Sequence, residues 1–275
     1  MKKYRIAALD MDGTMLNSKK EVTPQVQKAM NDALDRGVCV VINSGRNIGE
    51  LREYWDLFPK MRYVNCVSGA LVYDRIEKKA VYEKPLSGEL VSAIFDLMEK
   101  QSYEVMYHMH SVESIVQKGS IERMKQFNME HFQKMFRRIS LQLDDLREDY
   151  LREGFPVYKV NLYHSCEADR LATRKAIREA GLPVVLADSE HTSLEISPEG
   201  VTKAAGLAHV AQSLGLSMED VMCVGDADND RDALKASGLA VAMGNAKPGI
   251  KALCDVTVAD CDHDGVAEAI ETYCI

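Results

Sequence analysis

The stretch IAALDMDGTMLNS, at residues 6–18, decides the fold of this chain. Its four apolar residues, 6–9, are typical of a buried strand, and the run stops at Asp10. Because side chains alternate along a strand, Asp10 and Asp12 would point to the same side if the extended geometry continued. Two carboxylates placed this way repel each other unless a cation or a shared proton lies between them. The stretch therefore predicts a buried strand whose end carries a functional site.

The sequence on either side of this stretch alternates between predicted helices and strands. Thr23 and Pro24 are typical of an N-cap and a first helical position, and Gly37 ends that helix. The apolar run at 38–43 predicts a strand inside a parallel sheet. The same pattern predicts further helices over about 47–57, 200–214, from about 229 and from about 264, and strands around 62–67, 221–225, 239–243 and 256–259.

The middle of the chain differs from both ends because it mixes helical stretches with aromatic, strand-like pieces. Helices are predicted near 87–100, 120–138 and 167–180, with strand-like sequence between them. We therefore predict an α/β protein with a doubly wound, Rossmann-like parallel-sheet core and an inserted α+β cap domain. The predicted core comprises residues 1–83 and 189–275, and the predicted cap comprises residues 84–188.

Composition and charge argue against several classes of protein. The 275 residues carry a formal net charge of -8, which argues against a general binder of nucleic acid or of anionic membranes. The apolar run near the N-terminus is too short for a signal peptide, and no stretch reaches the length of a membrane span. The seven cysteines are scattered and form no CxxC pair, which favours reduced thiols and a cytoplasmic protein. Whether the chain is a monomer or a homodimer stays undetermined.

Chemically capable residues follow three predicted strands and begin one predicted helix. They are Asp10, Asp12, Gly13 and Thr14 after the first strand, NSGR at 43–46, GDADND at 225–230, and Lys203 at the start of a helix. In an open parallel sheet, the carboxyl ends of the strands line one crevice in which ligands bind. The sequence therefore predicts that several carboxylates, a serine and a lysine meet at one place.

This set of residues fits phosphoryl transfer assisted by a metal ion. Asp10 and Asp226 offer the hard oxygen ligands that Mg²⁺ prefers. Ser44, Lys203 and the backbone around Gly13 can hold phosphate oxygens. Asp10 would act as the nucleophile and form an aspartyl-phosphate, while Asp12 would act as general acid and base. That division of roles predicts a higher pKa for Asp12 than for Asp10.

DMDGT, NSGR, Lys203 and GDADND, in this order, resemble the four motifs of the haloacid dehalogenase (HAD) superfamily. The spacing and the insertion resemble its Cof-type sugar-phosphate phosphatases, subfamily IIB, which carry a C2B cap. AVAMGNA at 240–246 and DHDGV at 262–266 also look like that branch. The resemblance implies a Mg²⁺-dependent hydrolase of phosphomonoesters, with sugar phosphates as the expected substrates and a cap that selects a small phosphorylated substrate.

The resemblance also implies a role for each matching residue. Asp10 and Asp12 would be catalytic. The substrate phosphate would be bound by Asp12, Gly13, Ser44, Gly45, Lys203 and Asn229. Mg²⁺ would be held by Asp10, Asp12 through its backbone carbonyl, and Asp226, with Asp230 supporting these ligands.

Two other functions stay open at this point. A phosphomutase would return the phosphate to a sugar, and a binding protein would sense a phosphorylated ligand without turnover. A dehalogenase fits less well, because Asp12 and the Mg²⁺ ligands suit phosphate chemistry. His108 and His110, in the predicted cap, are candidate substrate contacts, although histidines within strands are more often structural.

Overall fold

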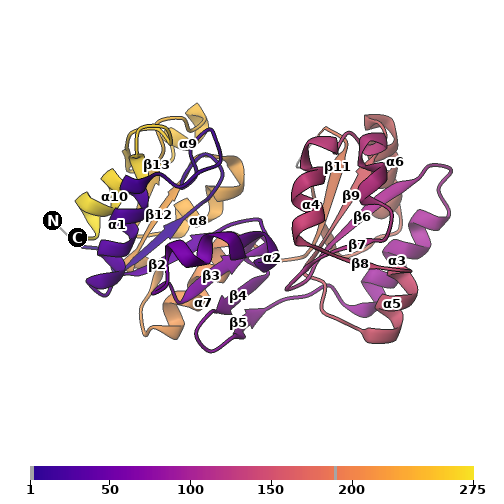
Figure 1. The fold of residues 1–275 in the computed structure, drawn as a ribbon, viewed down its shortest axis with the longest axis horizontal. Helices are drawn as coiled ribbons and strands as arrows, with labels where there is room; N and C mark the ends of the chain where they lie inside the picture. Colours follow the sequence, from indigo (N-terminus) through magenta and orange to yellow (C-terminus); the bar gives the residue numbers. More distant parts are fainter. Residues whose placement is uncertain (1–2, 189–190) are drawn as a thin grey trace. The chain divides into compact units, whose positions relative to one another are not determined.

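A computed structural model describes residues 3–188 and 191–275, and the chain forms two compact units (Figure 1). The first, called the core unit, comprises residues 1–46, 52–83 and 201–275. The second, called the cap unit, comprises residues 47–51 and 84–200. Each unit has its own sheet and is described by itself.

The core unit contains an eight-stranded sheet in the order β14-β13-β12-β1-β2-β3-β4-β5. Six strands are parallel: β1 (Ile6–Leu9), β2 (Cys39–Asn43), β3 (Tyr63–Cys66), β12 (Val221–Gly225), β13 (Leu239–Ala242) and β14 (Val256–Thr257). An antiparallel hairpin of β4 (Leu71–Asp74) and β5 (Lys79–Glu83) extends the sheet beyond β3. Strand β1 is completely buried between β2 and β12, so its end lies in the middle of the sheet.

Helices cover both faces of this sheet. Helix α1 (Pro24–Asp35) packs against α10 (Gly265–Tyr273), whereas α7 (Lys203–Ser213) packs against α8 (Arg231–Ala236). Strand β12 contacts one member of each pair, α10 and α8, as expected for a doubly wound sheet. The shorter helical elements of the core unit are η1 (Arg52–Leu57), η2 (Val67–Gly69), η5 (Met218–Asp220), η6 (Asp228–Asp230) and α9 (Pro248–Lys251).

The cap unit is built on a six-stranded sheet in the order β10-β11-β9-β6-β7-β8. All of its neighbouring strands are antiparallel except β7 and β8, which are parallel. The strands are β6 (Val105–His110), β7 (Ser114–Gln117), β8 (Ser140–Leu143), β9 (Lys159–His164), β10 (Val184–Ala187) and β11 (Ser193–Pro198). Its helical elements are α2 (Ile48–Leu51), α3 (Gly88–Glu99), η3 (Ile121–Phe127), η4 (Glu130–Phe132), α4 (Gln133–Ile139), α5 (Leu146–Glu153) and α6 (Glu167–Glu179).

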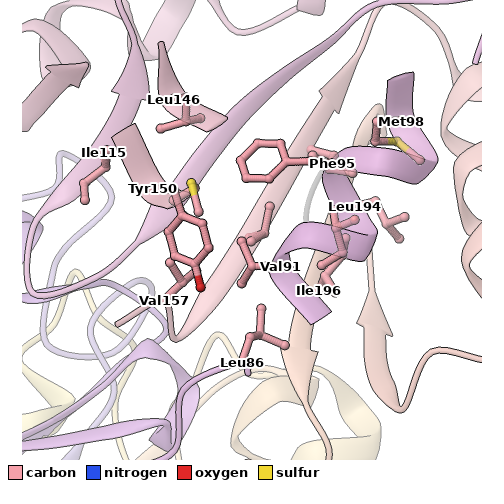
Figure 2. Close-up of a cluster of buried hydrophobic side chains, with 14 of the residues drawn as sticks. Leu86, Val91, Phe95, Met98, Ile115, Leu146, Tyr150, Val157, Leu194 and Ile196 are labelled. Carbon is pink, nitrogen blue, oxygen red and sulfur yellow. The ribbon is translucent and has the colours of Figure 1, made fainter. Parts of the chain in front are cut away.

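Two clusters of apolar side chains pack the cap sheet. One contains Phe95 and Met98 from α3 and Tyr150 from α5 (Figure 2), together with Ile177 from α6. The other joins side chains of η3 and α4, including Phe127 and Phe136, to Met106 and Tyr163 of the sheet. The cap unit therefore has a hydrophobic core of its own, as expected of a separate domain.

The predicted fold class, an α/β core with an inserted α+β cap, is confirmed. The helix predicted over 47–57 consists of two short pieces, α2 and η1. The hairpin of β4 and β5 is not among the predicted elements. The predicted boundary after residue 188 also differs from the compact units, because β11 pairs with β9 and β10 and so belongs to the cap sheet.

Candidate active site

Asp10, the predicted nucleophile, lies directly after β1 and is only 5% exposed. The ammonium group of Lys203 contacts its Oδ1 at 2.6 Å and Oδ1 of Asp230 at 2.6 Å. Lys203 is the first residue of α7, and Thr202 caps that helix by accepting a hydrogen bond from the backbone N–H of Ala205. The beginning of a helix therefore delivers one buried cation between two carboxylates that are distant in sequence.

Asp10, Asp226 and Asp230 form an acidic cluster in the core unit, and each offers an oxygen within 4.8 Å of the others. Thr14 donates to Oδ1 of Asp226 at 3.3 Å, and Asn245 donates to its Oδ2 at 3.4 Å. Such a set of carboxylate oxygens fits Mg²⁺, which takes hard oxygen ligands. Asp226 is half-buried, so one of the three carboxylates remains in contact with solvent.

Asp230 braces this cluster. It is completely buried, and its Oδ2 accepts the backbone N–H groups of Asp226 and Ala227, each at 3.2 Å. Because its Oδ1 contacts Lys203, Asp230 connects the loop that carries Asp226 to the start of α7. This arrangement fits the supporting role that the resemblance implies for Asp230.

Gly13 makes room for Asp226. Its φ angle is +81°, a backbone conformation in which L side chains are strained, and a Cβ atom placed there would lie 2.6 Å from Oδ2 of Asp226. The carbonyl of Gly13 accepts a hydrogen bond from Asn245 at 2.7 Å. The glycine in DMDGT therefore lets the first loop approach the acidic cluster closely.

Burial and like charge set the ionisation of the cluster. Burial raises the pKa of Asp10 to about 7; Lys203 opposes this rise, whereas Asp230 and Asp226 add to it. Burial also raises the pKa of Asp226, with a further contribution from Asp230. Burial alone would lower the pKa of Lys203, but Asp10 and Asp230 outweigh it and raise that pKa. Lys203 is therefore a permanent cation.

Asp12 has different surroundings, although it lies only two residues from Asp10. Its side chain is 43% exposed; Arg46 contacts both of its carboxylate oxygens, at 2.8 and 3.0 Å, and Lys20 contacts Oδ1 at 2.8 Å. Burial alone would raise the pKa of Asp12, but Arg46 and Lys20 outweigh it and lower that pKa. The predicted order, with the higher pKa at Asp12, is therefore wrong, because Arg46 and Lys20 both pair with Asp12 whereas burial raises the pKa of Asp10.

The predicted phosphate-binding residues of the second motif lie beside Arg46. The hydroxyl of Ser44 accepts the backbone N–H of Arg46 at 3.2 Å, and the N–H of Ser44 donates to the carbonyl of Asn65 at 2.8 Å. A Cβ at Gly45 would lie 3.3 Å from Oγ of Ser68. Arg46 thus connects Ser44 to Asp12. Asn229 is exposed within η6, and its contact with a phosphate stays a prediction.

Lys20 and Asn245 are not among the predicted site residues, and Arg46 is predicted only as part of NSGR. NSGR and AVAMGNA contain two of them, so the motifs held the signal. Arg46 and Asn245, however, reach Asp12 and Asp226 from separate loops, whereas Lys20 lies only eight residues after Asp12.

In the cap unit, His108 and His110 are buried and hydrogen-bonded, although Nε2 of His110 has no partner among the described residues. His108 contacts Oγ of Ser114 at 2.7 Å through Nε2, and Nδ1 of His110 lies 3.2 Å from Nδ2 of Asn47. Burial, together with the charge of Lys159, lowers the pKa of His108 to about 3. Burial, His108 and Lys159 lower the pKa of His110 well below its usual value. These contacts fit a structural role for both histidines.

Comparison with known proteins places this fold and site in a family. The profile of the haloacid dehalogenase-like hydrolases matches residues 7–270, so the chain belongs to that family. The resemblance to Cof-type phosphatases of the HAD superfamily is thereby confirmed. Across the described residues, no helix has the length and apolar character needed to span a membrane.

Individual relatives agree with the family. The chain is 29% identical to the 5-amino-6-(5-phospho-D-ribitylamino)uracil phosphatase YcsE of Bacillus subtilis, over 98% of this chain and 95% of that protein. It is 26% identical to the pyridoxal phosphate phosphatase YbhA of Escherichia coli, over 98% and 99%. A crystal structure of a haloacid dehalogenase-like hydrolase from Bacteroides thetaiotaomicron is similar with a TM-score of 0.85 and 25% identity, over 98% and 99%. The protein is a phosphoric monoester hydrolase of the HAD type.

Proposed function

We propose that this protein is a Mg²⁺-dependent phosphatase that hydrolyses phosphomonoesters of small metabolites through an aspartyl-phosphate on Asp10. The observation that carries the proposal is the buried cluster in which Lys203 contacts Asp10 and Asp230, with Asp226 beside them. A binding protein that only holds phosphate would gain nothing from a buried carboxylate at this position, because a carboxylate repels the phosphate group. A nucleophile needs that position.

The acidic cluster supports the choice of Mg²⁺. Asp10 and Asp226 would hold the ion with their carboxylates, Asp12 with its backbone carbonyl, and Asp230 would keep these ligands in place. When bound, the ion would supply positive charge that offsets the repulsion between the carboxylates and the substrate phosphate. It would also lower the pKa of Asp10, which burial raises to about 7.

The proposed reaction has two steps. A carboxylate oxygen of Asp10 bonds to phosphorus while the bond to the leaving oxygen breaks, and Asp12 donates a proton to that oxygen. Asp12 then takes a proton from a water molecule whose oxygen bonds to phosphorus, which releases phosphate and restores Asp10. Lys203, Ser44, Gly13, Gly45 and Asn229 would bind the phosphate oxygens.

Asp12 requires its proton in the first step, and this requirement gives Arg46 a role. Because Arg46 and Lys20 lower the pKa of Asp12, the carboxyl group can carry a proton only after at least one of these contacts is released. A phosphate group bound beside Ser44 would compete with Asp12 for Arg46, since Arg46 follows Ser44 by two residues and binds anions well. Substrate binding would thereby prepare the acid.

Small phosphorylated metabolites are the proposed substrate class, with sugar phosphates the first to test. The named activities of the relatives, on a ribitylaminouracil phosphate and on pyridoxal phosphate, widen the panel. We further propose that no nucleic acid or membrane takes part and that the protein is cytoplasmic.

The test is a phosphate-release assay with the purified protein. The substrates are p-nitrophenyl phosphate, a panel of sugar phosphates and the two substrates named for the relatives. We expect turnover that requires Mg²⁺, stops with EDTA and returns when Mg²⁺ is restored. Asp10→Asn should lower kcat by at least about a thousandfold because it removes the nucleophile.

Three outcomes would contradict the proposal. Activity that survives complete metal removal, or that survives Asp10→Asn, excludes this mechanism. An isomerised sugar phosphate in place of free phosphate identifies a mutase. Saturable binding of the substrates with no phosphate release at any pH identifies a binding protein.

A further inference from the structure

Two buried asparagines lie next to each other where β2 and β3 end. Asn43 and Asn65 are paired in register across these parallel strands, and both are 0% exposed. Nδ2 of Asn65 donates to Oδ1 of Asn43 at 2.7 Å. These are the last residue of β2 and the third residue of β3, and the other residues of β3 and of the end of β2 are buried and mostly apolar.

This pair does not satisfy all of its own polar atoms. Within the described part of the chain, Nδ2 of Asn43 and Oδ1 of Asn65 have no hydrogen-bond partner although both are buried. An unpaired buried polar atom destabilises a protein, and apolar side chains of similar shape avoid this loss. Stability of the sheet therefore does not explain these two residues, and Asn65 requires another role.

Asn65 connects the two segments that we assign to phosphate binding. Its Nδ2 also donates to the backbone carbonyl of Lys203 at 2.8 Å, and its backbone carbonyl accepts the N–H of Ser44 at 2.8 Å. One residue thus contacts the first residue of α7 with its side chain and the loop after β2 with its main chain.

The helix is shaped for this contact. A Cβ atom at Gly206, three residues after Lys203, would lie 1.9 Å from Oδ1 of Asn65. Only a glycine at that position lets the first turn of α7 come so close to Asn65. The first turn is therefore fitted to the side chain of Asn65.

We propose that Asn65 is a positioning residue that fixes the first turn of α7, and with it Lys203, relative to Ser44. This inference rests on the proposed function, in which Lys203 contacts the nucleophile Asp10 and both Lys203 and Ser44 bind phosphate. Asn65 itself touches no reacting atom. Its loss should leave Lys203 in the protein but displace its ammonium group from Asp10, and small displacements of this kind reduce catalysis strongly.

The experiment compares Asn65→Ala with Asn43→Ala. Both variants remove one member of the buried pair, so we expect both to lower Tm, Asn65→Ala more strongly because it also loses the bond to Lys203. Only Asn65→Ala removes the bond to Lys203. We expect it to lower kcat on p-nitrophenyl phosphate by about ten- to a hundredfold, with KM changed less than kcat, whereas Asn43→Ala stays within about threefold of wild type. If Asn65→Ala does not fold, Asn65→Leu and Asn43→Leu replace the pair.

Hydrogen exchange of the peptide covering residues 201–207 supplies a readout that does not depend on activity. We expect faster amide exchange there in Asn65→Ala than in Asn43→Ala. Equal losses of kcat in the two variants, or unchanged exchange at the start of α7, would overturn the inference. An inactive wild-type protein would instead reject the proposed function, and the exchange measurement would still decide whether Asn65 fixes the helix.

Discussion

At the scale of single residues, charge around Asp10 is the dominant feature. The carboxylates of Asp10, Asp226 and Asp230 lie close together, and the buried ammonium group of Lys203 contacts two of them, Asp10 and Asp230. Burial and the two neighbouring carboxylates raise the pKa of Asp10 despite Lys203. The single positive charge of Lys203 therefore does not offset the three carboxylates, and a divalent cation is the partner that would balance the remaining negative charge.

A comparison of two glycines tests how closely the first loop must approach Asp226. Gly13 and Gly37 both have a φ angle of +81°, but a Cβ at Gly37 would meet nothing within 4 Å. Gly37→Ala should lower the free energy of unfolding by about 1–2 kcal/mol, the cost of an L side chain in this conformation. Gly13→Ala should lose at least as much and also displace Asp226.

Urea denaturation and a Mg²⁺ titration of activity measure these two effects. We expect Gly13→Ala to need at least about tenfold more Mg²⁺ for half-maximal activity, because displacing the proposed ligand Asp226 should weaken metal binding about as much as loss of a supporting contact. Gly37→Ala should keep the wild-type requirement. An unchanged Mg²⁺ requirement in Gly13→Ala would show that Asp226 does not hold the metal.

At the scale of elements, the site is assembled where secondary structures begin and end. Asp10, Ser44 and Asp226 each follow a strand of the parallel sheet, while Lys203 begins α7. A parallel sheet collects the carboxyl ends of its strands at one edge, so residues distant in sequence meet there. Lys203 depends in addition on where α7 begins, and that point is set by the N-cap Thr202.

Replacing each of two threonine N-caps distinguishes an effect on helix stability from an effect on activity. Thr23 accepts the N–H of Val26 at the start of α1, and Thr202 accepts the N–H of Ala205 at the start of α7. Thr202→Ala should lower the free energy of unfolding by about 1 kcal/mol. Thr23→Ala should lower it by about 2 kcal/mol, because Thr23 also donates a hydrogen bond to Asp264. Only Thr202→Ala should lower kcat/KM, by several-fold, because Lys203 follows directly.

Chemical denaturation and assays with p-nitrophenyl phosphate check this prediction. A loss of kcat/KM in Thr23→Ala as large as that in Thr202→Ala would mean that activity follows overall stability and not the position of α7.

At the scale of the whole molecule, each of the two units has its own sheet and its own hydrophobic core. Several features of the core unit could be predicted from sequence, because buried parallel strands are short apolar runs and the site residues end them. The cap could be predicted only as a mixture of helices and strands. Its strand β8 (SLQL) alternates apolar and polar side chains over only four residues, and β11 lies beyond the predicted boundary.

Acid should destabilise the cap unit through its buried histidines. In the folded chain the pKa of His108 is lowered to about 3, whereas an unfolded chain has the ordinary value near 6.5. The unfolded state therefore binds more protons between these values, so the free energy of unfolding falls as the pH drops from about 6.5 toward 3. The slope is at most about 1.4 kcal/mol per pH unit for each histidine. His110 contributes with the same sign.

Denaturation of wild type, His108→Gln and His263→Gln at pH 5 and pH 7 measures this effect. His108→Gln should show a smaller loss of stability between pH 7 and pH 5 than wild type. His263 is exposed and its pKa is raised by Asp260, so its contribution has the opposite sign and its replacement should not flatten the dependence. An unchanged pH dependence in His108→Gln would contradict a neutral, buried His108 in the folded chain.

The α/β core, the insertion and the candidate residues Asp10, Ser44, Lys203 and Asp226 could all be predicted from the sequence. Local apolar patterns and the motifs that end strands can be recognised without knowing what packs against them. Only the tertiary structure decided the charge of these groups. The pairing of Arg46 with Asp12, and the contact of Asn65 with Lys203, join residues that are distant in the chain. A pKa depends on burial and on the distances between charges, and both are fixed by folding.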